Sequence, residues 1–226
     1  MLSDVEKAVV ADIHTVRETT SKKNPDIRRS ELVQYISPYL LPIVEQRAAE
    51  LSTLGYGCQF ITEVLLECQG DKSTAVNAVA NIASGDLSSA EHVVHNPAVG
   101  KMLRALVSGG KFDFETKKIN LTEPRLGFAG VLLKQLKGTL VDWAVSPISF
   151  VVVALLETED LEEAEKEAVR GELKKGKKVI EKAASGKDQA ARAEAPTDGG
   201  KAAKGKKKKG EALKGNAGAR IILEKL

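Results

Sequence analysis

Two residue pairs have the types that bind metals or carry redox chemistry. His92 and His95 are three apart, a spacing that can direct two imidazoles toward one ion from one helix face, but no third ligand is near and Glu91 points elsewhere. Cys58 and Cys68 are ten apart, which matches no zinc or disulfide-exchange motif. We therefore predict a histidine pair on the surface at a helix end and two buried thiols. No metal, cofactor or catalytic group is expected.

Positive charge gathers near the C-terminal end of the chain. Residues 171–214 hold 14 Lys or Arg against 6 Asp or Glu, although the net charge of the whole chain is only +3. Such a segment attracts polyanions, because each neutralised phosphate releases condensed counterions. The candidate phosphate-binding residues come from three clusters: Lys22, Lys23, Arg28 and Arg29; Lys174 and Lys175; and Lys201, Lys204, Lys206, Lys207, Lys208 and Lys209.

Two of these clusters also have a plainer interpretation. The run from Lys206 to Lys209 is equally typical of a nuclear-localisation patch or of a solubilising loop. Lys174 and Lys175 follow several glutamates along one expected helix, so an alternative interpretation is that part of this cluster serves only as internal ion-pair partners. The sequence leaves these alternatives open.

Composition limits the fold that presents these residues. Apolar residues make up 42% of the 226 residues and charged residues 29%, which is enough to bury a core. Aromatic residues make up only 4%, which argues against a β-sandwich or barrel. The longest apolar run, 150–156, is far shorter than the roughly 20 residues that a membrane span needs. We predict a soluble helical protein in which Trp143 packs in the core.

Apolar periodicity and capping residues predict the helices. We expect helices over 3–16, 28–36, 58–66, 72–82 and 148–156, and a charged helix over about 160–182. Ser37-Pro38 is expected to end one helix and begin the next. Alternating apolar residues within 111–124 indicate a short extended element, whereas residues 185–210, rich in Lys, Ala and Gly, indicate a flexible basic linker.

A recurring pattern relates four of these segments. A Gly or Pro opens each apolar helix at Gly57, Pro97, Pro147 and Gly215, at offsets of 40, 50 and 68 residues. Stacked helical repeats of this kind predict an all-α, right-handed solenoid. We expect helical repeats over 1–184, the linker over 185–210, and a helix within 211–226 that packs back on the last repeat. The apolar face near the start of the chain suggests further repeats upstream.

Several motifs resemble those of one family. These are Thr20-Ser21-Lys22-Lys23-Asn24-Pro25, Ile36-Ser37-Pro38, Gly57-Cys58-Gln59-Phe60, the stretch from Glu91 to Pro97, Asp142-Trp143-Ala144 and Gly215-Asn216-Ala217-Gly218. They are similar to the C-terminal section of the Penguin (Puf-A-type) divergent pumilio-homology proteins of the nucleolus. The resemblance implies pumilio-like (armadillo-type) repeats and RNA binding with little sequence preference. It also implies work on large-subunit precursors in ribosome biogenesis, and a role in translation regulation is known in the family.

Pumilio repeats read one base each with two or three side chains of one helix. Aligning the four Gly or Pro openers gives four short windows, one at the start of each apolar helix. In this alignment the base-edge and stacking positions are, window by window, Cys58, Gln59 and Thr62; Ala98, Val99 and Met102; Ile148, Ser149 and Val152; and Asn216, Ala217 and Arg220. Of these, Cys58, Gln59, Thr62, Asn216 and Arg220 are kept as degenerate RNA-binding candidates. Because the middle windows lack paired donors and acceptors, base reading has decayed and phosphate contacts remain.

Together with the basic clusters, the resemblance implies an RNA-binding assembly factor of the large ribosomal subunit, a component of the 60S pre-ribosome in the nucleus and nucleolus. Its expected partners are pre-rRNA, ribosomal proteins and assembly factors, with no membrane and no small-molecule substrate. Two alternatives stay open. One is a protein-only helical-repeat scaffold in the nucleus, and the other is an mRNA-binding translational repressor.

Overall fold

The computed structural model describes residues 22–113, 115–116, 118–185 and 215–226. In chain order its elements are α2 (Pro25–Ser52), α3 (Gly55–Glu67), α4 (Ser73–Asn81), the 3₁₀ helix η1 (Val93–His95), α5 (Pro97–Val107), β1 (Gly110–Asp113), β2 (Lys118–Leu121), α6 (Phe128–Leu136), α7 (Leu140–Val145), α8 (Phe150–Glu157), α9 (Glu163–Lys175), α10 (Lys177–Ser185) and α12 (Ala217–Glu224). The expected helix over 3–16 and nearly all of the expected linker lie outside the described residues.

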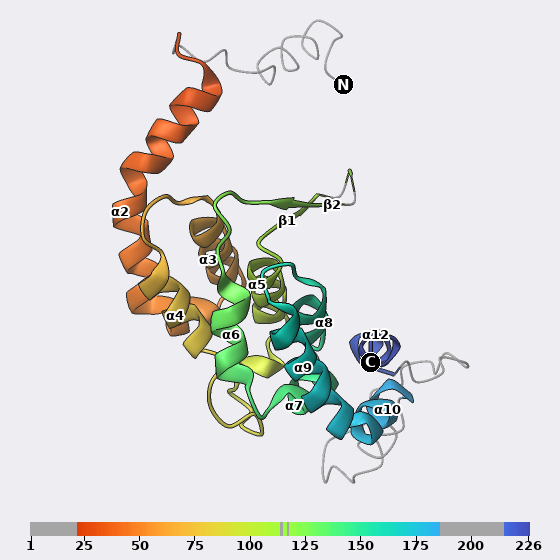
Figure 1. Cartoon of the computed structure of the whole chain (residues 1–226). Helices are drawn as coiled ribbons and strands as arrows, with labels where there is room; N and C mark the ends of the chain where they lie inside the picture. Colours follow the sequence, from red (N-terminus) through yellow and green to blue (C-terminus); the bar gives the residue numbers. More distant parts are fainter. Residues whose placement is uncertain (1–21, 114, 117, 186–214) are drawn as a thin grey trace, which may run out of the picture.

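The helices form two layers. In the back layer, which is fainter in Figure 1, α3 packs on α5, α5 on α8 and α8 on α12. The front layer consists of α4, α6 and α9, while α2 stands at one edge and packs on both α3 and α4. Each back-layer helix begins within three residues of one of the Gly or Pro openers. The repeat register therefore identified one whole layer of the structure.

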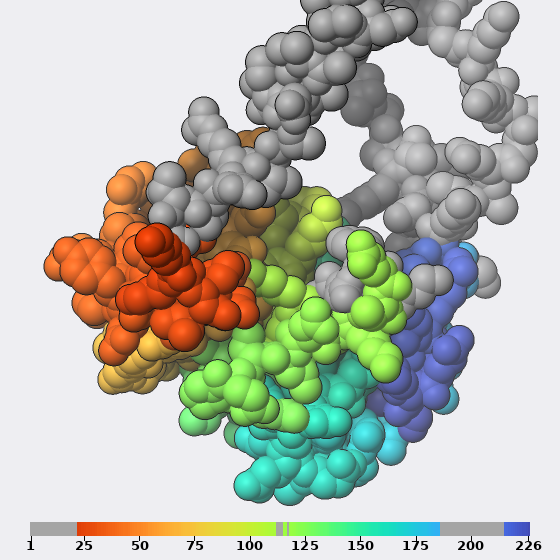
Figure 2. Space-filling model, turned by 90° about the horizontal axis from the view of Figure 1, so that it is seen from above, coloured from red at the N-terminus to blue at the C-terminus, as the bar shows by residue number. Residues whose placement is uncertain are grey.

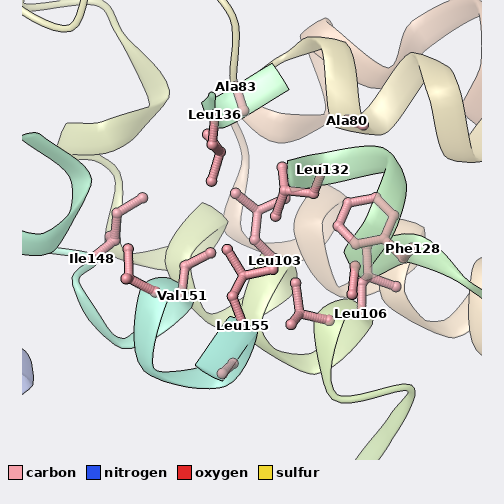
Figure 3. Packing of buried hydrophobic residues seen from close by; sticks show 14 of the residues in the cluster. Ala80, Ala83, Leu103, Leu106, Phe128, Leu132, Leu136, Ile148, Val151 and Leu155 are labelled. Carbon is pink, nitrogen blue, oxygen red and sulfur yellow. The ribbon is translucent and has the colours of Figure 1, made fainter. Parts of the chain in front are cut away.

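The core lies where α4, α5, α6 and α8 meet. Figure 3 shows Leu103 and Leu106 of α5 among side chains from the neighbouring helices, and both leucines are fully buried. Trp143 of α7 is also fully buried, as predicted. The apolar run 150–156 forms helix α8 rather than a strand, so its three consecutive valines are buried by tertiary packing despite their β propensity.

Helix α2 is longer than the sequence suggested. Asn24 caps its N-terminus by accepting a hydrogen bond from the Asp26 amide at 2.8 Å, and Pro25 takes the first turn, where its missing N–H costs nothing. The helix then continues through Pro38 and Pro42, so the predicted break at Ser37-Pro38 is wrong. Ser37 is buried and faces α3, with its hydroxyl donating to the Val33 carbonyl and accepting from the Gln69 amide. This tertiary anchoring holds α2 through the prolines.

The expected extended element is a two-stranded antiparallel hairpin that links α5 to α6. Gly110 pairs with Leu121, and a Cβ built at Gly110 would lie 2.2 Å from the Asn120 carbonyl oxygen. Only glycine permits this approach of the two backbones. In the view of Figure 2, the hairpin lies between the N-terminal end of α2 and α12.

The charged segment after residue 160 is helical but divided in two. A capping box starts α9, in which the Glu165 carboxylate accepts from the Glu162 amide at 3.0 Å. The helix ends at Gly176, where a Cβ would come within 2.4 Å of Val141 on α7. The chain then bends into α10, which packs against α7 and α12. Within the described ranges, no helix is both long enough and apolar enough to cross a membrane.

Candidate functional site

In the first window, two of the three expected base-edge side chains serve the fold. Cys58 at the start of α3 is buried, and its thiol donates to the Ser52 carbonyl at 3.4 Å. Burial raises the pKa of the Cys58 thiol. Thr62 donates to the Cys58 carbonyl at 2.8 Å, which leaves Gln59 as the exposed member of the window.

In the second and third windows all the expected positions except Ala98, which is partly buried, face the core. Val99, Met102, Ile148, Ser149 and Val152 are each no more than 4% exposed, so they cannot meet a base. The expected decay of base reading thus has a steric cause. These residues pack in the core between the helices, and other positions of the same helices face the solvent.

In the fourth window, Asn216 is occupied by the fold. Its Oδ1 caps α12 by accepting from the Ala219 amide at 3.1 Å, and it also accepts from the Ser149 hydroxyl at 2.8 Å. Its Nδ2 donates to the carbonyls of Val145 and Ser146 at 3.2 and 2.9 Å. Asn216 therefore joins α12 to the end of α7 and the start of α8.

The remaining candidate of this window is Arg220. Its side chain is exposed, and its Nε donates to the Ala184 carbonyl of α10 at 3.1 Å. This bond fixes the guanidinium near the surface of α12 without neutralising its charge.

Asn96 plays the corresponding part at α5. Its Oδ1 caps the helix by accepting from the Ala98 amide at 2.9 Å, and its Nδ2 donates to the Ser52 carbonyl at the end of α2. The same residue type thus starts two back-layer helices and joins each of them to an earlier part of the chain. The asparagines of this pattern are joints between repeats.

The sequence analysis missed two cations that occupy the surface of α5. Lys101 and Arg104 are three apart on the exposed face of the helix, and neither forms an ion pair with the described residues. The Arg104 guanidinium lies 5.4 Å from the centroid of the Phe150 ring on α8, a cation–π contact that positions it without neutralising its charge. Their spacing on a helix with an otherwise apolar face was the available signal.

Three of the four acidic groups of the back layer have partners, and Glu224 at the end of α12 is the exception within the described residues. Lys111 of β1 bridges Glu63 and Glu67 of α3, and Lys225 pairs with Glu157 at 2.9 Å. Hydrogen bonds from Lys111 and Arg29 lower the pKa of Glu67. These pairs leave Lys101, Arg104 and Arg220 as positive charge on the exposed faces of α5 and α12.

The predicted N-terminal cluster is partly neutralised. Lys23 pairs with Glu31, and Arg29 pairs with Glu67 at 2.8 Å. Lys22 is exposed, and Arg28 is half-buried in a 730 Å³ groove between α2 and α3.

The cluster at the end of α9 is more open than expected. Arg170, rather than a lysine, pairs with Glu163 and Glu167, both at 2.7 Å. Lys174 and Lys175 are exposed and form no ion pair with any residue that the structure describes, so their interpretation as internal ion-pair partners is wrong. Lys201, Lys204 and the run from Lys206 to Lys209 lie outside the described residues.

The histidines and cysteines have structural contacts. His92 is half-buried, not a surface residue as predicted: its Nδ1 accepts from the Val94 amide at 3.1 Å, and its ring meets Trp143 edge-on with centroids 6.2 Å apart. The ring of His95 is exposed and lies 3.2 Å from the Leu87 carbonyl oxygen. Both thiols are buried, as predicted, and the described part of the chain contains no group of three potential metal ligands.

Three curated proteins are similar to this chain in sequence. Pumilio homology domain family member 6 of Schizosaccharomyces pombe is 29% identical over 78% of this chain and 27% of the relative. The Saccharomyces cerevisiae protein of that name is 30% identical over 62% of the chain and 24% of the relative. Human Pumilio homolog 3 is 29% identical over 76% and 28%. The chain thus spans about a quarter of the length of these curated relatives.

Solved structures agree with these matches. The crystal structure of human Puf-A superposes with a TM-score of 0.63 at 22% identity, covering 98% of this chain and 36% of that one. The crystal structure of human Puf-A in complex with DNA gives a TM-score of 0.58 at 25% identity, covering 80% and 34%. This likeness confirms the predicted helical solenoid. The model of the CPL (NUC119) domain matches residues 1–118, so the chain belongs to the CPL (NUC119) family of Puf-A-type pumilio-homology proteins.

Proposed function

We propose that this chain binds nucleic acid through the phosphate backbone, with little preference for base sequence. One contrast carries the proposal. Most of the back-layer positions that would read bases are buried or hydrogen-bonded within the fold, and Gln59 is the exposed polar exception. Lys101 and Arg104, by contrast, are exposed and unpaired within the described ranges. Contacts to phosphate position a nucleic acid but carry no direct sequence information.

The comparisons support this proposal through the relative that was crystallised with DNA. The resemblance to Penguin-type proteins adds a finer expectation. We propose that the natural ligand is RNA of large-subunit precursors, that the chain acts in the nucleolus, and that it serves as an assembly scaffold rather than an enzyme. Crosslinking in cells followed by sequencing of the bound RNA tests this finer expectation, which fails if large-subunit precursor RNA is not enriched.

Salt dependence provides the direct test of phosphate binding. The full chain is titrated against a fluorescein-labelled, single-stranded 16-nucleotide RNA and two scrambled versions between about 50 and 300 mM salt. We expect dissociation constants that agree within about threefold among the sequences and rise steeply with salt. The double variant K101A/R104A should lower the slope of log K against log salt by about 1.4, because each lost phosphate contact contributes about 0.7 for single strands.

A matched control separates this effect from a general loss of charge. Lys134 and Lys137 are also exposed lysines, but they lie at and just beyond the end of α6 in the front layer. The double variant K134A/K137A should retain the wild-type slope. Preference for one RNA by orders of magnitude at high salt would instead favour the translational repressor. No measurable RNA binding would favour the protein-only scaffold.

A further inference from the structure

An apolar groove lies between α6 and α9, with Leu140 of α7 also in its lining. Its volume is 510 Å³, and Leu133, Leu140 and Val169 contribute apolar side chains to its lining. Gly130 of α6 and Gly171 of α9 also line it, and a Cβ built at either position meets no described atom within 4 Å. The absence of side chains at these two positions keeps the groove open.

The acidic residues at this groove already have partners in the fold. Glu172 accepts hydrogen bonds from the amides of Leu140 and Gly138 at 3.0 and 3.2 Å, and these bonds hold the start of α7. Glu165 accepts from the Glu162 amide in the capping box of α9. Both carboxylates keep their charge, but they are only partly exposed and are engaged with these amides, and three lysines line the groove against these two glutamates.

The basic residues at the groove are free. Lys134, Lys137 and Lys175 line it, all three are exposed, and none forms an ion pair or a hydrogen bond to a side chain within the described ranges. The groove therefore combines an apolar floor with a rim whose available charge is positive. An occupant that complements both features needs apolar side chains flanked by carboxylates.

We propose that this groove docks an acidic amphipathic helix from a protein partner. Apolar side chains spaced at i, i+3, i+4 and i+7 would fill the floor, and flanking Asp or Glu would pair with the three lysines. The lining has no aromatic ring on which a base could stack, which disfavours nucleic acid here. The lysine-rich stretch 186–214 of this chain carries charge of the same sign as the rim and is a poor occupant. This proposal does not depend on phosphate binding at Lys101 and Arg104.

The test uses a designed probe on the full chain. The probe is a fluorescein-labelled 18-residue helical peptide with leucines at i, i+3, i+4 and i+7 and glutamates beside them, and its control carries lysines in place of the glutamates. By fluorescence anisotropy, we expect at least tenfold tighter binding of the glutamate peptide. Reversing the rim with K134E/K137E/K175E should invert this preference.

Filling the groove tests the apolar contribution separately. Gly171→Leu should weaken glutamate-peptide binding at least tenfold while the thermal unfolding midpoint is retained, and Gly171→Ala is the matched control that leaves room for the peptide. K101A/R104A should bind the peptide as the wild type does, which separates this site from the proposed phosphate contacts. Equal affinity for both peptides, or unchanged binding to Gly171→Leu, would overturn the proposal. Displacement of the probe by a peptide of residues 1–18 would also overturn it, by identifying the occupant as this chain's own first segment.

Discussion

Replacing Asn216 with alanine should release α12 from the end of the array. The substitution removes a helix cap worth about 1 kcal/mol. It also removes the bonds to the Ser149 hydroxyl and to the carbonyls of Val145 and Ser146. Each of these contributes about 1 kcal/mol, and the Ser149 side chain is left buried. The sum is about 3–4 kcal/mol, a large fraction of the stability of a typical domain.

Amide hydrogen exchange measured by mass spectrometry resolves this change locally. If α12 opens independently of the rest, a loss of about 3 kcal/mol raises its exchange rates roughly 150-fold, while α5 and α6 keep their protection. Asn216→Asp is the matched control. Its carboxylate can retain the two accepted bonds, but it places a negative oxygen against the carbonyls of Val145 and Ser146, so we expect α12 to exchange faster even though its cap is kept.

The same variant distinguishes a structural joint from a base-reading side chain. If Asn216→Ala leaves the exchange of α12 unchanged and yet abolishes selective oligonucleotide binding, then Asn216 contacts a base and our reasoning is refuted. The four hydrogen bonds of Asn216 predict the opposite outcome. Exchange should increase in α12 alone, and the salt dependence of RNA binding should stay as in the wild type.

Two further perturbations follow from local geometry. Gly176→Ala should destabilise the chain by about 1–3 kcal/mol because its Cβ would overlap the Val141 side chain, whereas Gly171→Ala should stabilise α9 by up to about 1 kcal/mol. Urea unfolding measures both free energies. Equal effects of the two substitutions would contradict this packing. The second concerns acid stability. Hydrogen bonds from Lys111 and Arg29 lower the pKa of Glu67 from its ordinary value. The ionised carboxylate therefore stabilises the fold above that ordinary value, and this contribution is lost as pH falls through the folded-state pKa. Glu67→Gln should therefore flatten the acid limb of a plot of unfolding free energy against pH, and an unchanged limb would exclude this contribution.

The sequence identified the helices of the back layer because glycine and proline openers mark where those helices start. It failed at α2, where two prolines suggested a break. Proline removes a backbone donor, but the cost of that loss depends on packing, and the buried hydroxyl of Ser37 anchors the helix to the Gln69 amide just after α3. This contact spans 32 residues, so no local pattern reveals it.

The candidate site was predictable in type but not in position. Charge patterning indicated phosphate binding, yet the family register pointed to Val99 and Met102, which are buried, instead of Lys101 and Arg104 on the exposed face of the same helix. A shift of one or two residues on a helix moves a side chain by 100–200°, so a register without a known orientation cannot distinguish core from surface. Only the packing of α5 between α3 and α8 decides it.

Helix-upon-helix stacking in the back layer has a mechanical consequence. The helices α3, α5, α8 and α12 pack in succession. A force that peels the C-terminal end away would therefore break the contacts of Asn216 before those of Asn96. Pulling should therefore dismantle the array in steps, one hairpin at a time.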